Sequence, residues 1–92
     1  MLPVLWLENA DRDLDYITSY IARFDIDAAK RLWQRLKRCV QPLSEYPHLY
    51  PPSDRVPSLR EIIAHPNYVI LYQVTTSRVE VVSIVHTSRQ FP

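Results

Sequence analysis

The sequence predicts an α+β domain that consists of an N-terminal strand, an antiparallel helical hairpin and a three-stranded antiparallel meander, with the helices packed on one face of the sheet. Three observations support this fold class. A short apolar run at residues 3–7 comes first, two segments with helical spacing follow, and three runs rich in β-branched and aromatic residues complete the chain. A chain of 92 residues has room for one domain, which we take as residues 1–92.

Composition and charge exclude several classes of protein. Apolar residues make up 47% of the chain and charged residues 23%, which is typical of a globular domain and not of a disordered one. The net charge of +1 lacks the basic excess of a dedicated nucleic-acid binder. Cys39 is the only cysteine, so no internal disulfide and no multi-cysteine zinc site can form, and we expect no metal, no cofactor and a cytoplasmic location. Glu8 and Asp11 follow the apolar start closely, which argues against a signal peptide or a membrane span.

The first two elements follow from proline position and apolar period. Residues 3–7 suit an edge strand, because Pro3 has no amide proton to donate to a neighbouring strand. Asn9 is then positioned to cap a helix. The next apolar residues are spaced by four, three, four and three, so they share one helical face: Ala10, Leu14, Ile17, Ile21 and Phe24.

A second helix is predicted after residues 24–27, whose aspartates can cap it. Pro42 should end or kink this helix near Val40. The short connection between the helices predicts an antiparallel hairpin. Trp6 and Trp33 fall in the apolar periods, so we expect them in the core. The second helix also carries a basic face, which we expect to be solvated and balanced by Asp11, Asp13 and Asp15: Lys30, Arg31, Arg35, Lys37 and Arg38.

The second half of the chain contains a proline-rich loop at residues 47–57 and strands at residues 58–65, 68–74 and 79–85. Tyr68 and Tyr72 share one face of their strand, and Val69 and Leu71 share the other, so both faces of the sheet are apolar. One face should pack on the helical hairpin. The other should form a groove for a partner, and such a surface should make the free protein sticky or homodimeric.

An ordered set of segments resembles the ParE-type toxins of the RelE/ParE superfamily, the toxin halves of bacterial toxin–antitoxin modules. The set begins with residues 6–14, an apolar strand that leads to Ala and then Asp-Leu, and continues with Ala28-Ala29 and Leu43-Ser-Glu-Tyr-Pro47. Leu59-Arg60-Glu61, the strand 68–74 and the ending His86-x-x-Arg89-x-Phe91-Pro92 complete it. The resemblance covers nearly the whole chain. Many relatives place a glycine before the Leu-Arg-Glu run, whereas this chain has Ser58.

The resemblance implies two functions of different classes. ParE-like members bind and poison DNA gyrase, whereas RelE-like members are ribosome-dependent endoribonucleases that cut mRNA. Both form hetero-oligomers with a cognate antitoxin that neutralises them. A third alternative is an inert member that only binds its antitoxin.

Chemistry favours the gyrase branch. RNA cleavage by 2′-OH attack needs a base, an acid and cations that stabilise the phosphorane-like charge. The residues available for an endoribonuclease are Arg60, Glu61, His86 and Arg89. No tyrosine follows Arg89, and Phe91 cannot transfer a proton. Because phosphate contacts supply most of the affinity for RNA, a net charge of +1 also argues against ribosome docking.

Under the gyrase hypothesis the protein has no catalytic residue, and the target-binding candidates are Arg60, His86, Arg89, Gln90, Phe91 and, on the proline-rich loop, Arg55. The antitoxin-binding candidates are Leu14, Ile21, Tyr68 and Tyr72. Structural alternatives stay open for two of these residues. Arg60 could instead form a cross-strand ion pair, for instance with Glu80, and His86 could be a hydrogen-bonded strand end.

Overall fold

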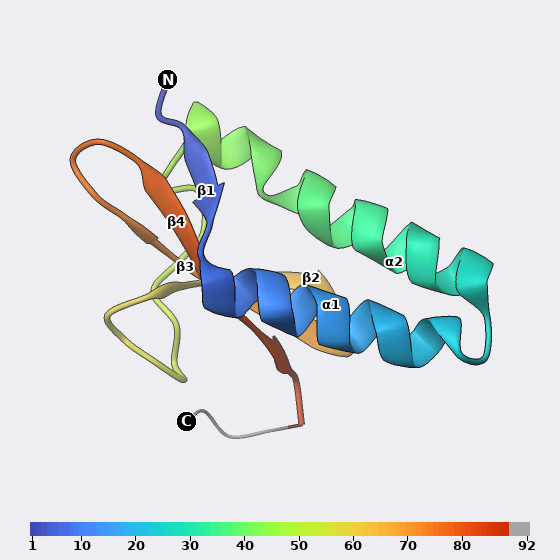
Figure 1. Cartoon of the computed structure of the whole chain (residues 1–92). Helices are drawn as coiled ribbons and strands as arrows, with labels where there is room; N and C mark the ends of the chain where they lie inside the picture. Colours follow the sequence, from blue (N-terminus) through green and yellow to red (C-terminus); the bar gives the residue numbers. More distant parts are fainter. Residues whose placement is uncertain (89–92) are drawn as a thin grey trace.

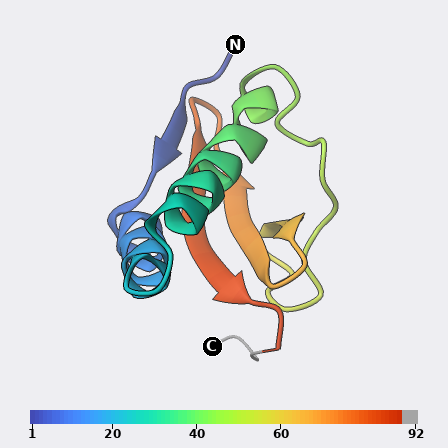
Figure 2. The ribbon, with the colours of Figure 1, turned by 90° about the vertical axis from the view of Figure 1, so that its right-hand side faces the viewer.

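The computed structural model describes residues 1–88 and has the predicted α+β architecture. A four-stranded sheet has the order β1-β4-β3-β2, and both helices lie on one side of it (Figures 1 and 2). β1 pairs with β4 in parallel, and the other two pairs are antiparallel, as expected for a meander. The elements are β1 (Val4–Trp6), α1 (Glu8–Ala22), α2 (Ile26–Cys39), a 3₁₀ turn (Gln41–Ser44), β2 (Arg60–His65), β3 (Tyr68–Val74) and β4 (Val79–His86).

β1 is an edge strand, as the proline at position 3 predicts, and it is too short to cover the whole edge of β4. Its pairing with β4 spans three residues and ends at Trp6 opposite Val81. Beyond that point, side chains of α1 bind the β4 backbone. The Asn9 amide donates to the carbonyl of Val82 (3.2 Å), and the Asp13 carboxylate accepts from the amide of Ile84 (3.0 Å).

The capping role predicted for Asn9 is therefore wrong, because α1 already begins at Glu8 after Leu7 as N-cap. The predicted apolar face of α1 is correct at Ala10 and Leu14, which are buried. It fails at Phe24, whose side chain is 75% exposed. The helix ends at Ala22, so Phe24 lies in the turn and no longer follows the helical face.

α2 is capped as predicted, since the Asp25 carboxylate accepts a hydrogen bond from the amide of Ala28 at 3.0 Å. Its end also agrees with the prediction from Pro42. The helix stops at Cys39, with Val40 as C-cap, and Pro42 lies in the following 3₁₀ turn. Trp33 departs from its predicted core position, because its side chain is 44% exposed on the rim of the hairpin.

The main core fills the space between the hairpin and the sheet. It contains buried residues of α1, α2, the 3₁₀ turn and all strands except β1, with Trp6 packed against it as predicted: Ala10, Leu14, Leu32, Leu36, Val40, Leu43, Ile62, Ala64, Ile70, Tyr72, Val79, Val81 and Ile84. Within residues 1–88, no helix combines the length and apolar character needed to cross a membrane.

The opposite face of the sheet is not the open groove that the sequence suggested. Leu59, Val69, Leu71 and Val85 form a second, smaller apolar cluster there, and Val56 of the proline-rich loop packs against it. The loop is tied to the β2 edge, since the amide of Glu61 donates to the carbonyl of Pro51 (3.1 Å). The rigid loop thus covers apolar surface that would otherwise face a partner.

Candidate functional site

Arg60 holds the proline-rich loop against the start of β2. Its Nη1 donates to the carbonyl of Tyr50 at 2.6 Å. Next to it, the buried Tyr72 hydroxyl donates to the carbonyl of Pro47 at 2.9 Å, and burial raises the pKa of this phenol. The alternative ion pair between Arg60 and Glu80 is wrong. Glu80 instead binds the guanidinium of Arg78 at 2.6 Å.

Glu61 points to the other face of the sheet, as strand alternation requires. Its Oε1 accepts from the Ser53 hydroxyl (2.7 Å) and lies 3.3 Å from the Nε of Arg55. Arg55 in turn donates through Nη2 to the carbonyl of Thr87 (3.1 Å). This polar network joins the loop, β2 and the residue that follows β4, so Arg55 reaches the start of the tail.

His86 ends β4 opposite Tyr68 of β3, and the two rings meet edge to face with centroids 5.4 Å apart. The amide of Ser88 donates to His86 Nδ1 at 3.1 Å. Because a backbone N–H can only donate, Nδ1 is the acceptor in this contact. His86 is therefore a hydrogen-bonded strand end, and its half-buried ring remains partly accessible to a partner.

Three residues of α1 that the sequence analysis did not select lie beside His86: Asp13, Tyr16 and Tyr20. Together with Ile17, Tyr68, Ile84 and His86 they line a cavity of about 400 Å³, which we call the aromatic cleft. The sequence contains a pattern that could have indicated this cleft. Positions 13, 16 and 20 are spaced by three and four, so they share one flank of the helix next to the apolar face.

The structure does not bring the predicted site residues into one cluster. Arg60 pairs with Tyr72 and His86 pairs with Tyr68, at opposite ends of β3. Four residues along a strand correspond to roughly 13 Å. Arg89, Gln90 and Phe91, which were also predicted to contact the target, lie outside the described residues.

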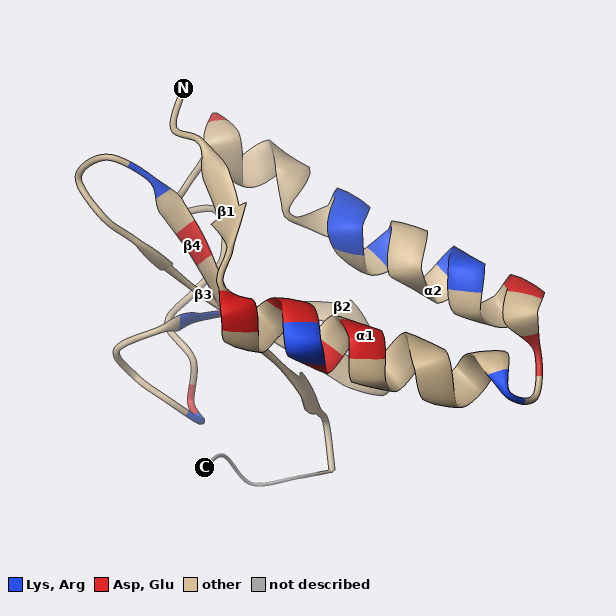
Figure 3. Ribbon diagram, in the orientation of Figure 1, with Lys and Arg blue, Asp and Glu red and all other residues tan. Residues whose placement is uncertain are grey.

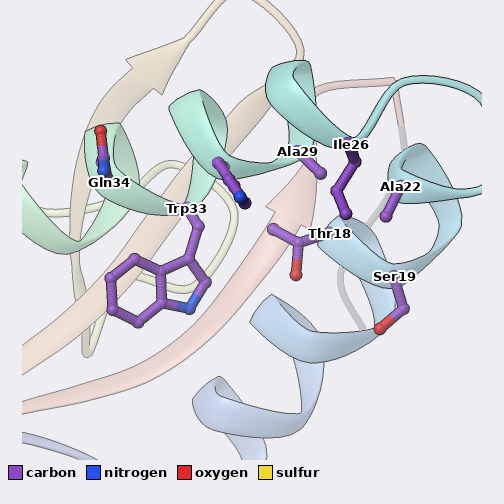
Figure 4. Close-up of a pocket in the computed structure, with 8 residues that line it drawn as sticks. Thr18, Ser19, Ala22, Ile26, Ala29, Trp33 and Gln34 are labelled. Carbon is purple, nitrogen blue, oxygen red and sulfur yellow. The ribbon is translucent and has the colours of Figure 1, made fainter.

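The hairpin itself contains a second hollow, the hairpin groove, of about 270 Å³ between α1 and α2 (Figure 4). Trp33 and Ile26 line it from α2, and Thr18 and Ala22 line it from α1. Of the antitoxin-binding candidates, Ile21 and Tyr68 are half-buried. The side chains of Leu14 and Tyr72 are only 1% and 0% exposed, so they offer a partner no surface in this structure.

Charge is divided between the two helices, with acidic residues on the first half of α1 and basic residues along α2 (Figure 3). Only part of the predicted balance between them forms within residues 1–88. Lys37 pairs with Asp11 at 3.6 Å, whereas Asp13 binds β4 instead. The guanidinium of Arg35 donates to the carbonyl of Ala64 at 2.8 Å. Arg31, Arg35 and Arg38 line a further cavity, of about 460 Å³, beside β2.

Comparisons with known proteins agree with this architecture. A family model described as the ParE toxin of type II toxin-antitoxin systems, parDE, matches residues 4–91. The chain is similar to the protein named Toxin RelE2 of Caulobacter vibrioides, with 38% identity over 91 residues that span 97% of this chain and 99% of that protein.

Solved structures show the same fold. The chromosomal ParDE TA system from P. aeruginosa contains a chain that matches with a TM-score of 0.82 and 21% identity, over 94% of this chain and 96% of that one. YafQ from E. coli matches with a TM-score of 0.55 and 14% identity over 100% of both chains. From the family match and the identity to its relative, the chain belongs to the ParE toxin family of type II toxin–antitoxin systems.

Proposed function

We propose that this toxin inhibits growth by binding and poisoning DNA gyrase, without catalysis of its own, and that a cognate antitoxin neutralises it. The observation that carries the proposal is the separation of the candidate catalytic groups among residues 1–88. Arg60 and His86 pair with β3 residues that are four positions apart, roughly 13 Å along the strand, and Glu61 lies on the other face of the sheet within an ion pair. Catalysis of RNA cleavage requires a base, an acid and a cation within hydrogen-bond reach of one phosphate.

The hydrogen bond that His86 accepts supports the same proposal. Its Nδ1 lone pair accepts the hydrogen bond from Ser88, and a general base needs a free lone pair directed at the 2′-hydroxyl. The net charge of +1 also suits a protein target better than the phosphate-rich surface of a ribosome. A contact role requires only that His86 and the tail be presented to the target.

The hairpin supports an antitoxin partner. The hairpin groove is apolar, and several large apolar side chains around and beyond it are exposed: Tyr16, Tyr20, Phe24, Ile26 and Trp33. The basic face of α2 flanks the groove through Lys30. We therefore propose that the antitoxin covers the hairpin with an amphipathic segment whose acidic residues face α2, and that the uncovered toxin self-associates.

The test uses the full-length toxin after release from its antitoxin. One assay follows supercoiling and DNA cleavage by gyrase, and a parallel assay follows mRNA integrity on translating ribosomes. We expect linear plasmid to accumulate with gyrase while mRNA stays intact. Cut mRNA with unaffected gyrase would overturn the proposal in favour of a RelE-like endoribonuclease, and silence in both assays would point to an inert, antitoxin-binding protein.

Two variants sharpen this test. His86→Ala removes the ring at the end of β4 and should reduce gyrase poisoning. Arg12→Ala is the matched control, because Arg12 is an exposed residue of α1 that pairs with Glu8 at 2.6 Å and does not line the aromatic cleft. An equal loss of poisoning in both variants would contradict a contact role for His86.

A further inference from the structure

The aromatic cleft has a composition that the proposed function does not explain. Three tyrosine rings and the His86 imidazole surround it, and they come from α1, β3 and β4. Tyr16 is 74% exposed, so its ring is available to a ligand. Two isoleucines, Ile17 and Ile84, complete the lining. A site with four aromatic rings is suited to a flat or cationic group, because the ring faces carry partial negative charge.

The carboxylate of Asp13 gives the cleft a negative charge. Asn9, Ser83 and Ile84 all donate to the same oxygen of this carboxylate, Oδ2, at 3.0–3.4 Å. Among residues 1–88 no hydrogen bond to Oδ1 is formed, so this oxygen remains able to accept one from a ligand. Asp13 is thus held in place by the protein and keeps an acceptor at the wall of the cleft.

The part of α1 around the cleft is also negatively charged. The first half of α1 carries Glu8, Asp11, Asp13 and Asp15 against the single cation Arg12. No lysine or arginine is among the residues that line the cleft. A neighbouring contact illustrates the attraction, since the guanidinium of Arg23 already lies 5.9 Å from the centre of the Tyr20 ring. This electrostatic environment attracts cations and repels phosphate groups.

We propose that the aromatic cleft binds the guanidinium of an arginine side chain that a partner protein inserts between Tyr16 and the ring pair of Tyr68 and His86. Arginine fits better than lysine, because its planar group stacks on aromatic rings and presents two parallel N–H donors to a carboxylate such as Asp13. The inference deepens the proposed function, since it rests on the toxin acting through protein partners. It does not depend on which partner supplies the arginine.

The test titrates the isolated full-length toxin, labelled with carbon-13 in its tyrosine and histidine rings, with N-acetyl-arginine methylamide. Ring signals of Tyr16, Tyr68 and His86 should shift together and saturate, with a Kd on the order of millimolar for so small a probe. The citrulline analogue has nearly the same shape without the charge. We expect it to bind at least about tenfold more weakly, because it lacks both the cation–π attraction and the charged contact with Asp13.

Variants identify the rings that contribute. Tyr16→Ala should weaken arginine binding about two- to fivefold, the range for a solvent-exposed cation–π contact, and Tyr16→Phe should restore it. Tyr46→Ala is the matched control, because Tyr46 is an exposed tyrosine that does not line the cleft. It should leave binding unchanged.

Three results would overturn the proposal. Equal shifts with arginine and citrulline probes would show that charge is not recognised, and an unchanged affinity in Tyr16→Ala would place the binding elsewhere. Ring shifts with adenosine monophosphate but none with the arginine probe would make the cleft a nucleobase site instead. The gyrase and ribosome assays measure a different property of the protein, so this inference can fail while the proposed function stands.

Discussion

The side chain of Asp13 supplies a hydrogen-bond acceptor at the edge of β4, where β1 is too short to provide one. β1 ends opposite Val81, and Asp13 accepts the Ile84 amide that no strand partner reaches. Replacement by alanine leaves that partly buried amide without its acceptor, which costs about 1–3 kcal/mol of unfolding free energy. We expect the urea midpoint of Asp13→Ala to fall accordingly.

Asp15→Ala is the matched control for this prediction, because Asp15 is an exposed acidic residue two positions later in the same helix. Its replacement should change the free energy of unfolding by less than about 0.5 kcal/mol, as is usual for surface positions. Equal midpoints for the two variants would mean that the hydrogen bonds of Asp13 contribute nothing to the sheet edge.

Cys39 provides a second prediction for a single residue. Burial raises the pKa of its thiol from 9.0 to about 11, and the hydrogen bond that the thiol donates to the carbonyl of Leu36 also favours the protonated form. Only the thiolate attacks a disulfide reagent, so the native protein at pH 8 should hold about a hundredfold less thiolate than an exposed cysteine. Ellman's reagent should therefore label the native protein far more slowly than the urea-unfolded chain. Similar rates in both states would contradict the raised pKa.

At the scale of elements, α2 depends on its N-cap. Asp25 accepts from the amide of Ala28, so Asp25→Ala should lower the free energy of unfolding by about 1 kcal/mol. Asp25→Asn keeps a side-chain oxygen in the same place and should stay close to the original stability, because Asn and Asp cap equally well. Equilibrium urea unfolding followed by circular dichroism measures both. A loss as large in the Asn variant as in the Ala variant would assign the effect to charge and not to capping.

The helices and strands could be predicted from the sequence because local signals determine their type. The 3.6-residue period located both helices, Asp25 marked one start and Pro42 marked one end. Alternation placed Tyr72 and Leu71 on opposite faces of β3, as the two apolar clusters show. These patterns act over a few residues, so a single sequence is enough to reveal them.

The errors arose where distant segments meet. Asn9 is a residue type that often caps helices, but its side chain instead donates to the backbone of Val82 at the unpaired edge of β4. Asn9 and Val82 are 73 positions apart in sequence. The cover of the second sheet face by Val56 likewise depends on how the loop folds back over β3 and β4. Tyr16 and Tyr20 had the spacing of a helix flank, yet only the packing of α1 beside Tyr68 and His86 makes them part of a site.

At the scale of the whole molecule, the proposed functional surfaces lie at different places on one scaffold. The hairpin groove lies between the helices, whereas the aromatic cleft lies where α1 meets the ends of β3 and β4. The network of Arg55, Glu61 and Thr87 anchors the base of the tail on the far face of the sheet. We therefore expect that the proposed partner binding through the hairpin and the proposed target contact through the tail can be altered separately.

Truncation tests this separation. Removal of residues 89–92 leaves His86, its contact with Tyr68 and the hydrogen bond from Arg55 to Thr87 in place, so the fold and antitoxin binding should be retained. Gyrase poisoning should be lost, because Arg89, Gln90 and Phe91 are the proposed tail contacts. The full-length chain with Gln90→Ala alone serves as a mild comparison. Antitoxin affinity measured by calorimetry and DNA cleavage measured with gyrase distinguish the two functions, and full poisoning by the shortened chain would show that the tail is not the target-binding segment.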